Sequence, residues 1–559
     1  MNFHSLAYIV FLLAVLAGYW CLRPRWQNWF LIPASLLFYG WVQPWFLLPF
    51  AATTVIDYFV ARGIAAAPAR KRALVAVSVV SNFALLGVFK YFNFFVANVS
   101  ALLDALHLHV PLPVLHVVLP AGISFYTFQS IGYVVDVSRG HVPACRSFRD
   151  YALFVAFFPQ LVAGPIQRAG HLLTQIQRPR TLTPAVAADA LFLLVWGFFK
   201  KVVIADNVAV TANKVFALAD PSFPILWTGV LAFCIQIYAD FSAYTDIARG
   251  TARLLGFDLS PNFNHPYLAD SPSDFWRRWH ISLSAWIRDY VFIPLGGSRG
   301  GTGRTLLNLT IIFLLTGLWH GASWNFVLWG LYYAVLTIVY RLAASVVPAV
   351  LQTLPGLRTG RILLMFALTN LGWLIFREQN IAHLWRDLIL RPGAASPGDW
   401  HVAAYLTATT AIYTLPLLLH IIWTPPSARS SRAGMAGPAW PAGSPRPPPS
   451  CSSPASSSCA ATPRRTSFTS SSKAPAPAAG RCENGKGAAS FQPPTHGCAQ
   501  RPILSARAPP RGPNAVSSRA WLAVRKGDVT RAILPAVAWR RRGVRGQDCP
   551  RYAGARGGS

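Results

Sequence analysis

Charged residues are scarce in this sequence. Only 12% of its 559 residues are Asp, Glu, Lys or Arg, whereas soluble globular proteins carry about a quarter. Hydrophobic residues make up 53% of the chain, its mean hydropathy is positive, and long apolar runs recur along it. The composition therefore argues against an ordinary soluble domain and predicts an all-α, polytopic membrane protein.

Glutamate and cysteine are also scarce. Glu378 is the only glutamate before residue 426, so paired glutamates are missing from most of the chain. Three scattered cysteines before that point, without a CxxC pair, indicate neither a disulfide framework nor a metal site. The sequence also lacks HExxH, GxSxG and a P-loop in the right context. Hydride transfer, ATP hydrolysis and zinc hydrolysis are thus poorly supported.

The net charge of +31 is unevenly distributed. Residues 426–559 hold 21 Lys and Arg and three Asp and Glu, and residues 1–425 hold 29 and 16. We predict a membrane-embedded domain at 1–424 and a basic, Arg/Pro/Ser/Ala-rich, disordered tail at 425–559. The tail could be an arm that contacts anionic lipid or nucleic acid. The favoured interpretation is an extension without a selected role, such as the product of a shifted reading frame, and no nucleic-acid partner is predicted.

Apolar segments predict about ten to twelve transmembrane or re-entrant helices. Residues 1–25 lack a basic start and a clear cleavage site, so the first run is interpreted as a membrane helix rather than a signal peptide. Several segments are short or contain Pro and Gly, which predicts re-entrant pieces around an internal cavity. The candidate spans are 5–21, 28–40 with 44–61, 73–95, 117–137, 151–166, 185–205, 224–244, 305–318 with 322–343, 361–376 and 403–423.

Basic loops indicate the orientation of the first third of the chain. Lys and Arg gather at 22–27, 62–72 and 138–150, and 96–120 has none. Because basic loops face the cytoplasm, we expect the N-terminus on the periplasmic side. The charge pattern assigns no topology beyond residue 150.

A polar segment near the middle of the chain predicts one helix from Asp274 to Pro294, with Ser273 as its N-cap. Such a helix could lie at the membrane interface with snorkelling arginines and an aromatic belt, or it could line a cavity. In a continuous helix, one face would carry Arg277, His280, Ser284 and Arg288.

His320 lies in the apolar stretch TGLWHGASWNFVLW, where small neighbours leave room beside its ring. A polar side chain at bilayer depth is costly and is a functional candidate by default. Neutral imidazole suits a general base that acts on a hydroxyl, with an activated acyl donor supplied from outside. The alternative is a structural hydrogen bond that joins two helices.

Six motifs extend this interpretation: YTFQSIGYVVDVSRG (126–140), FFPQLVAGPIQR (157–168), GFFKKVVIAD (197–206), DFSAYTDIARGTARLLGFDL (240–259), FWRRWHISLSAWIRDYVFIPLGG (275–297) and TGLWHGASWNFVLWG (316–330). Together they resemble the membrane-bound O-acyltransferase (MBOAT) family, and more closely its bacterial alginate O-acetylation branch. The resemblance covers residues 1–423 and implies a funnel of helices with a thin central region that holds an intramembrane site.

The resemblance also implies a reaction. An acyl thioester, acetyl-CoA or a carrier-protein thioester, would arrive from the cytoplasm as a co-substrate, with no bound cofactor. A periplasmic acetyltransferase partner, working with the polysaccharide export and synthesis complex, would complete O-acetylation of a secreted, alginate-like polysaccharide. The chain would lie in the bacterial inner membrane. Three alternatives remain open from the sequence: the same chemistry on peptidoglycan, cellulose or teichoic acid, a proton-coupled transporter that uses His320 as a relay, and an inactive scaffold.

The predicted catalytic residues are His320, as base or transient acyl acceptor, and His280, as a group that orients it or stabilises charge. Both follow from the family's two polar catalytic positions. The arginines of the polar segment would attract an anionic donor, and Asp240, Tyr244 and Asp246 are interpreted as structural. The predicted substrate-binding residues are Arg277, Arg278, Arg288, Trp319 and Asn325. After the span at 403–423 this sequence departs from the pattern of the branch, whose members usually have one more hydrophobic helix there.

Overall fold

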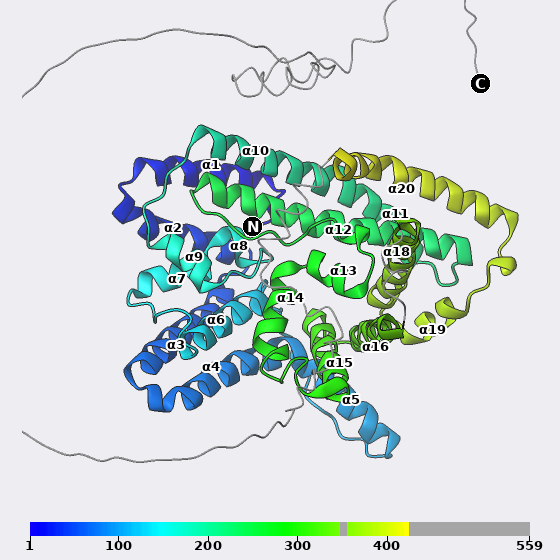
Figure 1. Ribbon diagram of the computed structural model, residues 1–559, viewed down its shortest axis with the longest axis horizontal. Helices are drawn as coiled ribbons and strands as arrows, with labels where there is room; N and C mark the ends of the chain where they lie inside the picture. Colours follow the sequence, from blue (N-terminus) through cyan, green and yellow to red (C-terminus); the bar gives the residue numbers. More distant parts are fainter. Residues whose placement is uncertain (347–354, 424–559) are drawn as a thin grey trace, which may run out of the picture. The chain divides into compact units, whose positions relative to one another are not determined.

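A computed structural model describes residues 1–346 and 355–423 (Figure 1). The chain divides into two units, Met1–Ser453 and Pro454–Ser559, and all described residues lie in the first. Within them the regular structure is entirely helical, which confirms the all-α class. The predicted tail at 425–559 lies outside the described residues.

The α-helices are α1 (Leu6–Cys21), α2 (Pro24–Gly40), α3 (Leu47–Ala66), α4 (Lys71–Leu86), α5 (Phe92–Ala105), α6 (Ile123–Ser138), α7 (Phe148–Ala156), α8 (Phe158–Leu161), α9 (Ala169–Ile176), α10 (Pro184–Phe199), α11 (Asp206–Phe216), α12 (Phe223–Leu254), α13 (Pro272–Arg278), α14 (Ile281–Ile287), α15 (Gly301–His320), α16 (Trp324–Val346), α18 (Pro355–Arg377), α19 (Ile381–Ile389) and α20 (Pro397–Trp423). Three π-helical turns are η3 (Gly87–Tyr91), η4 (Lys200–Ala205) and η6 (Arg288–Phe292). The 3₁₀ turns are η1 (Pro44–Phe46), η2 (Pro68–Arg70), η5 (Pro266–Leu268) and η7 (Pro392–Ala394).

Seven helical stretches in the described part are long and apolar enough to cross a membrane, which confirms a polytopic membrane protein. The first predicted span coincides with α1, which is apolar but shorter. Other predicted spans fall on short or interrupted helices. The seven stretches are Pro44–Ala66, Pro68–Ala105, Phe223–Leu254, Gly301–His320, Trp324–Ala344, Gly356–Arg377 and Pro397–Trp423.

The long helix α12 packs against α10, α11, α18 and α20 (Figure 1). Ion pairs tie α12 to the turn η4. Asp246 lies 2.8 Å from Lys200 Nζ, and Asp240 lies 2.8 Å from Lys201 Nζ. Both aspartates therefore have basic partners in the scaffold, as their structural interpretation expected.

The predicted span at 151–166 is broken. Helix α7 ends at Ala156, α8 is four residues long, and the chain is not helical again until Ala169. Buried amide side chains bond the freed backbone: Gln129 Nε2 and Gln160 Nε2 donate to the Phe154 carbonyl at 2.6 and 3.0 Å. This matches the expectation that irregular backbone in this protein is enclosed by other parts of the chain.

Helices α15 and α16 approach each other closely at glycines. A Cβ atom on Gly317 would lie 2.2 Å from the Phe326 carbonyl oxygen, and one on Gly330 would lie 2.5 Å from the Phe313 carbonyl oxygen. Small residues allow such close helix packing in membranes. The contact fixes the turn between the two helices, where His320 lies.

Candidate active site

His320 is the last residue of α15. The final carbonyl groups of a helix have no partner within it. Here two side chains from the π-turn η3 supply donors: the Tyr91 hydroxyl donates to the Leu318 carbonyl at 2.8 Å, and Lys90 Nζ donates to the Trp319 carbonyl. The helix end that carries His320 is thereby held by side chains far away in the sequence.

The His320 side chain lines a cavity of about 270 Å³ and is partly exposed to it. Its ring contacts Trp319 and Trp329, each at 5.0 Å between centroids, and Phe376 at 5.3 Å. The imidazole thus faces a largely aromatic chamber that contains no carboxylate. The lining residues are Lys90, Ser124, Phe125, Ile237, Phe241, Trp279, Trp319, His320, Trp373 and Phe376.

His280 lies between two short helices, so the prediction of one helix from Asp274 to Pro294 is wrong. Helix α13 is capped by Ser271 rather than Ser273, and Trp279 is already extended. His280 itself is left-handed, with φ 44° and ψ 54°, a conformation uncommon for residues other than glycine. The predicted shared face of His280 with the arginines does not form.

A short run of backbone pairing accounts for the break. The Asn264 amide donates to the Arg278 carbonyl at 3.0 Å, and the Ile281 amide donates to the Asn262 carbonyl at 2.9 Å. The Ser282 amide donates to Asn262 Oδ1 at 3.1 Å. These bonds replace those that a continuous helix would make, because buried backbone groups need partners. Helical periodicity alone does not reveal partners that lie 14 to 20 residues upstream.

The His280 ring is 1% exposed and lies among aromatic side chains. Its centroid is 4.8 Å from Phe241, 5.6 Å from Trp319 and 6.3 Å from Phe125, all of which line the cavity beside His320. Neither ring nitrogen has a hydrogen-bond partner within the described residues. His280 lies outside the membrane-spanning helices, and burial, followed by the nearby His320, lowers its pKa well below the usual range. The structure thus brings both predicted catalytic histidines to one aromatic wall.

Two predicted substrate-binding residues flank His320 in different ways. Trp319 lines the cavity and contacts both histidine rings. Asn325 is fully buried and does not line it; its Nδ2 donates to the Phe376 carbonyl at 2.9 Å. Asn325 therefore contacts the backbone of Phe376, whose ring packs on His320.

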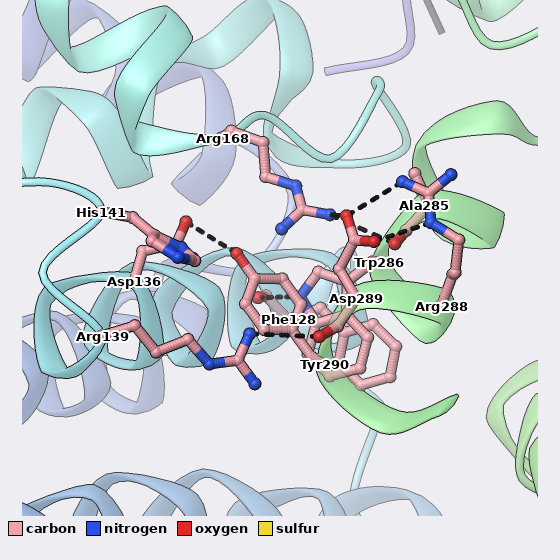
Figure 2. Close-up of polar contacts among 10 residues, drawn as sticks. All are labelled: Phe128, Asp136, Arg139, His141, Arg168, Ala285, Trp286, Arg288, Asp289 and Tyr290. Atoms are coloured by element: carbon pink, nitrogen blue, oxygen red, sulfur yellow. Dashed lines mark hydrogen bonds and ion pairs between the residues drawn. The ribbon is translucent and has the colours of Figure 1, made fainter. Parts of the chain in front are cut away.

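The three predicted arginines do not line the cavity. Arg277 and Arg278 pair with Asp274 at 3.2 and 2.7 Å. Arg288 is buried and bonds Asp289 with two of its nitrogens (Figure 2). Each of these guanidinium groups therefore has an acidic partner within the protein.

The Arg288 pair belongs to a network that joins separate segments (Figure 2). Arg168 donates to the Asp289 carboxylate at 2.7 Å, and Arg139 donates to the Asp289 backbone carbonyl at 3.1 Å. The hydroxyl of Tyr290 donates to Asp136 at 2.7 Å. The network ties α6 and the GPIQR segment to η6, which continues directly from the helix after His280.

Sequence reasoning missed Lys90, which lines the cavity with His320. The sequence contains a signal for this residue, because Lys90 is the only charged residue between Ala73 and Leu103. An isolated charge inside an apolar span is a functional candidate in the same way as His320.

This fold and this cavity define a polytopic membrane protein with two histidines on one aromatic wall, an arrangement that suits acyl transfer to a hydroxyl. Comparisons with known proteins identify the family. Residues 137–371 match the family model of MBOAT, the membrane-bound O-acyltransferase family. The chain therefore belongs to this family and is an O-acyltransferase.

The relatives are bacterial. The chain is 42% identical to "Probable alginate O-acetylase AlgI" of Azotobacter vinelandii over 72% of this chain and 79% of that protein. It is 41% identical to the protein of the same name from Pseudomonas aeruginosa, over 72% and 76%. It is 36% identical to the "Peptidoglycan O-acetyltransferase" of Helicobacter pylori, over 65% and 74%.

Proposed function

We propose that this chain moves an acetyl group from a cytoplasmic thioester across the inner membrane for the O-acetylation of a secreted, alginate-like polysaccharide. The observation that carries the proposal is the position of His320 on an aromatic cavity, with His280 in contact with the same Trp319. The names of the alginate relatives, which are the more similar of those compared, favour alginate over peptidoglycan as the acceptor.

The chemistry assigned to His320 is general base catalysis. A hydroxyl of the acceptor loses its proton to an unprotonated ring nitrogen of His320 while its oxygen attacks the thioester carbonyl carbon. The resulting oxyanion then collapses, the carbon–sulfur bond breaks, and the leaving thiolate takes the proton from His320. The cavity lining contains no carboxylate that could compete for this role.

His280 contacts the same Trp319 ring as His320. Its nitrogens make no hydrogen bond to the described residues, although they are buried and His280 is not among the residues that line the cavity. As a neutral imidazole it can donate one hydrogen bond and accept another. We assign it the orientation of the acceptor or acyl group rather than proton abstraction.

The proposed donor is acetyl-CoA or a carrier-protein thioester, which enters from the cytoplasm. Contacts between helices support a common location of the basic loops on the cytoplasmic side. The Tyr58 hydroxyl donates to the Arg146 carbonyl at 2.8 Å, and Asn28 Nδ2 donates to Asp150 Oδ1 at 3.1 Å, so the basic loops of the first third of the chain lie together. Basic loops favour the cytoplasm, which leaves the N-terminus in the periplasm.

The remaining parts of the proposal concern partners. A periplasmic acetyltransferase and the export and synthesis complex would receive the acetyl group on the outer side. Arg277, Arg278 and Arg288 could attract an anionic donor only from a distance, because each is paired and none lines the cavity.

A rescue experiment tests the function. A strain that lacks its own enzyme is complemented with this chain, with His320→Ala, or with His401→Ala, which removes an exposed histidine of α20. Acetyl esters on the secreted polysaccharide are measured at matched membrane abundance. We expect the unmodified chain and His401→Ala to restore acetylation, and His320→Ala to reduce it at least about 100-fold.

Other outcomes have defined meanings. If His320→Ala restores acetylation fully, His320 is structural, and the hypotheses of a transporter or a scaffold gain support. If acetyl esters appear on peptidoglycan instead of the polysaccharide, the chemistry stands and the acceptor is wrong. Loss of acetylation with polysaccharide export intact excludes a pure scaffold.

A further inference from the structure

Lys90 is a basic residue inside a membrane-spanning stretch, and it faces the cavity of His320. The π-turn η3 interrupts the regular helix at this point, between α4 and α5. Such turns are rare and often lie at functional sites. Among the residues that line the cavity, Lys90 is the sole lysine or arginine.

The hydrogen bonds of Lys90 leave part of its ammonium group unused. It donates to the Trp319 carbonyl, and it lies 3.4 Å from Ser124 Oγ. An ammonium group has three donors, so one remains for the cavity. The ion pairs of residues 1–346 and 355–423 do not include Lys90.

The hydrogen bond that Lys90 makes to the end of α15 does not explain why this residue carries a charge. The neighbouring Tyr91 bonds the preceding carbonyl, that of Leu318, with a neutral hydroxyl. A neutral donor is therefore sufficient for this task, and a charge at membrane depth is costly. A cation that faces a chamber without carboxylates suits a ligand on which negative charge develops.

We propose that Lys90 binds the carbonyl oxygen of the transferring acyl group and stabilises its negative charge in the tetrahedral intermediate. This role rests on the proposed acyl transfer. When the hydroxyl oxygen bonds to the carbonyl carbon, the π electrons of the carbonyl move to its oxygen, and the hydroxyl proton goes to His320. The ammonium of Lys90 then faces a full negative charge, where a preorganised donor has its largest effect.

Four substitutions separate the charge from the hydrogen bond. Lys90→Met removes both, Lys90→Gln keeps a donor without charge, and Lys90→Arg keeps the charge. Tyr91→Phe removes the matched bond to the Leu318 carbonyl and leaves the charge in place. The initial rate of polysaccharide acetylation is measured after induction in the deletion strain and is divided by the membrane abundance of each variant, with His320→Ala in parallel.

We expect Lys90→Met and Lys90→Gln to lower the rate by roughly 10²–10³, the usual loss for one oxyanion donor. Lys90→Arg should retain at least about ten times the rate of Lys90→Gln, and Tyr91→Phe should lose far less than Lys90→Met. A Lys90→Gln rate close to that of the unmodified chain would overturn the proposal and leave Lys90 as a helix cap. So would equal losses for Lys90→Met and Tyr91→Phe.

The His320→Ala variant distinguishes a failure of the Lys90 proposal from a failure of the acyl-transfer proposal on which it rests. If His320→Ala is inactive and Lys90→Gln is active, only the role of Lys90 is refuted. If His320→Ala retains activity, the acyl-transfer mechanism itself fails and the role of Lys90 fails with it. If Lys90→Met does not accumulate in the membrane, Lys90→Gln and Lys90→Arg decide the outcome.

Discussion

The indole of Trp319 contacts the imidazole of His280, with 5.6 Å between the ring centroids. On its own helix the same indole contacts His320 at 5.0 Å. One aromatic side chain thus touches both histidines, although they come from segments 40 residues apart. Trp319 therefore sets the geometry between the two rings as well as forming the wall of the cavity.

Replacing Trp319 should therefore damage activity through geometry. We expect Trp319→Ala to lower polysaccharide acetylation at least about tenfold and to destabilise the protein by about 3–5 kcal/mol, the usual cost of truncating a buried Trp. Trp319→Phe keeps a flat ring and should retain most of the activity. Acetyl esters at matched abundance and thermal unfolding in detergent measure the two effects. Equal activity in Trp319→Ala and Trp319→Phe would contradict the positioning role.

The backbone at His280 makes a second prediction. Asn tolerates the left-handed conformation that His280 adopts, whereas a β-branched residue does not. His280→Asn should therefore fold normally and lose acetylation, because it lacks the imidazole. His280→Val should lose acetylation and also about 1–3 kcal/mol of stability. Thermal unfolding compares the two variants, and equal melting temperatures would show that the backbone at this position is unstrained.

The helix break at His280 was not predicted from the sequence. His320 was selected because it is an isolated polar group in an apolar run, and His280 was selected through the resemblance to the family's second polar position. The spacing of Arg277, His280 and Arg288 predicted a shared face that does not exist. The cause is tertiary: Asn262 and Asn264 pair with the backbone around His280, and helical periodicity does not report such a partner.

The predicted spans at 224–244 and 403–423 are confirmed, because both fall within spanning stretches. Long apolar runs of this kind need only the bilayer to specify a helix. Lys90 was overlooked although it is an isolated charge in an apolar run, and its contact with the end of α15, 229 residues away in the chain, is visible only in the structure. The arginines were chosen by charge, and their acidic partners lie within four residues of them.

Burial of His280 predicts a pH dependence of stability. Its pKa is lowered in the folded protein from an unfolded value of 6.5. Above pH 6.5 the ring is neutral in both states and contributes no pH dependence. As the pH falls below 6.5, the unfolded chain takes up a proton that the folded protein does not, so the free energy of unfolding decreases.

We therefore expect the melting temperature of the unmodified protein to fall more steeply between pH 6.5 and pH 5 than that of His280→Asn. Both proteins are measured in the same detergent and at constant ionic strength. Because other histidines titrate in both proteins, only the difference between the two curves reports His280. Parallel curves over this range would show that the buried ring accepts a proton without cost.

The close contact between α15 and α16 makes the last prediction. Gly330→Ala would place a Cβ atom 2.5 Å from the Phe313 carbonyl oxygen, which backbone cannot accommodate without moving. We expect a loss of about 1–3 kcal/mol, typical of overpacking, and reduced acetylation because the end of α15 carries His320. Gly360→Ala in α18 is the matched control, since a Cβ atom there meets nothing within 4 Å. It should leave the melting temperature unchanged or slightly higher, because alanine favours the helix. If Gly330→Ala and Gly360→Ala melt alike in detergent, the two helices are free to separate, and the position of His320 does not depend on their contact.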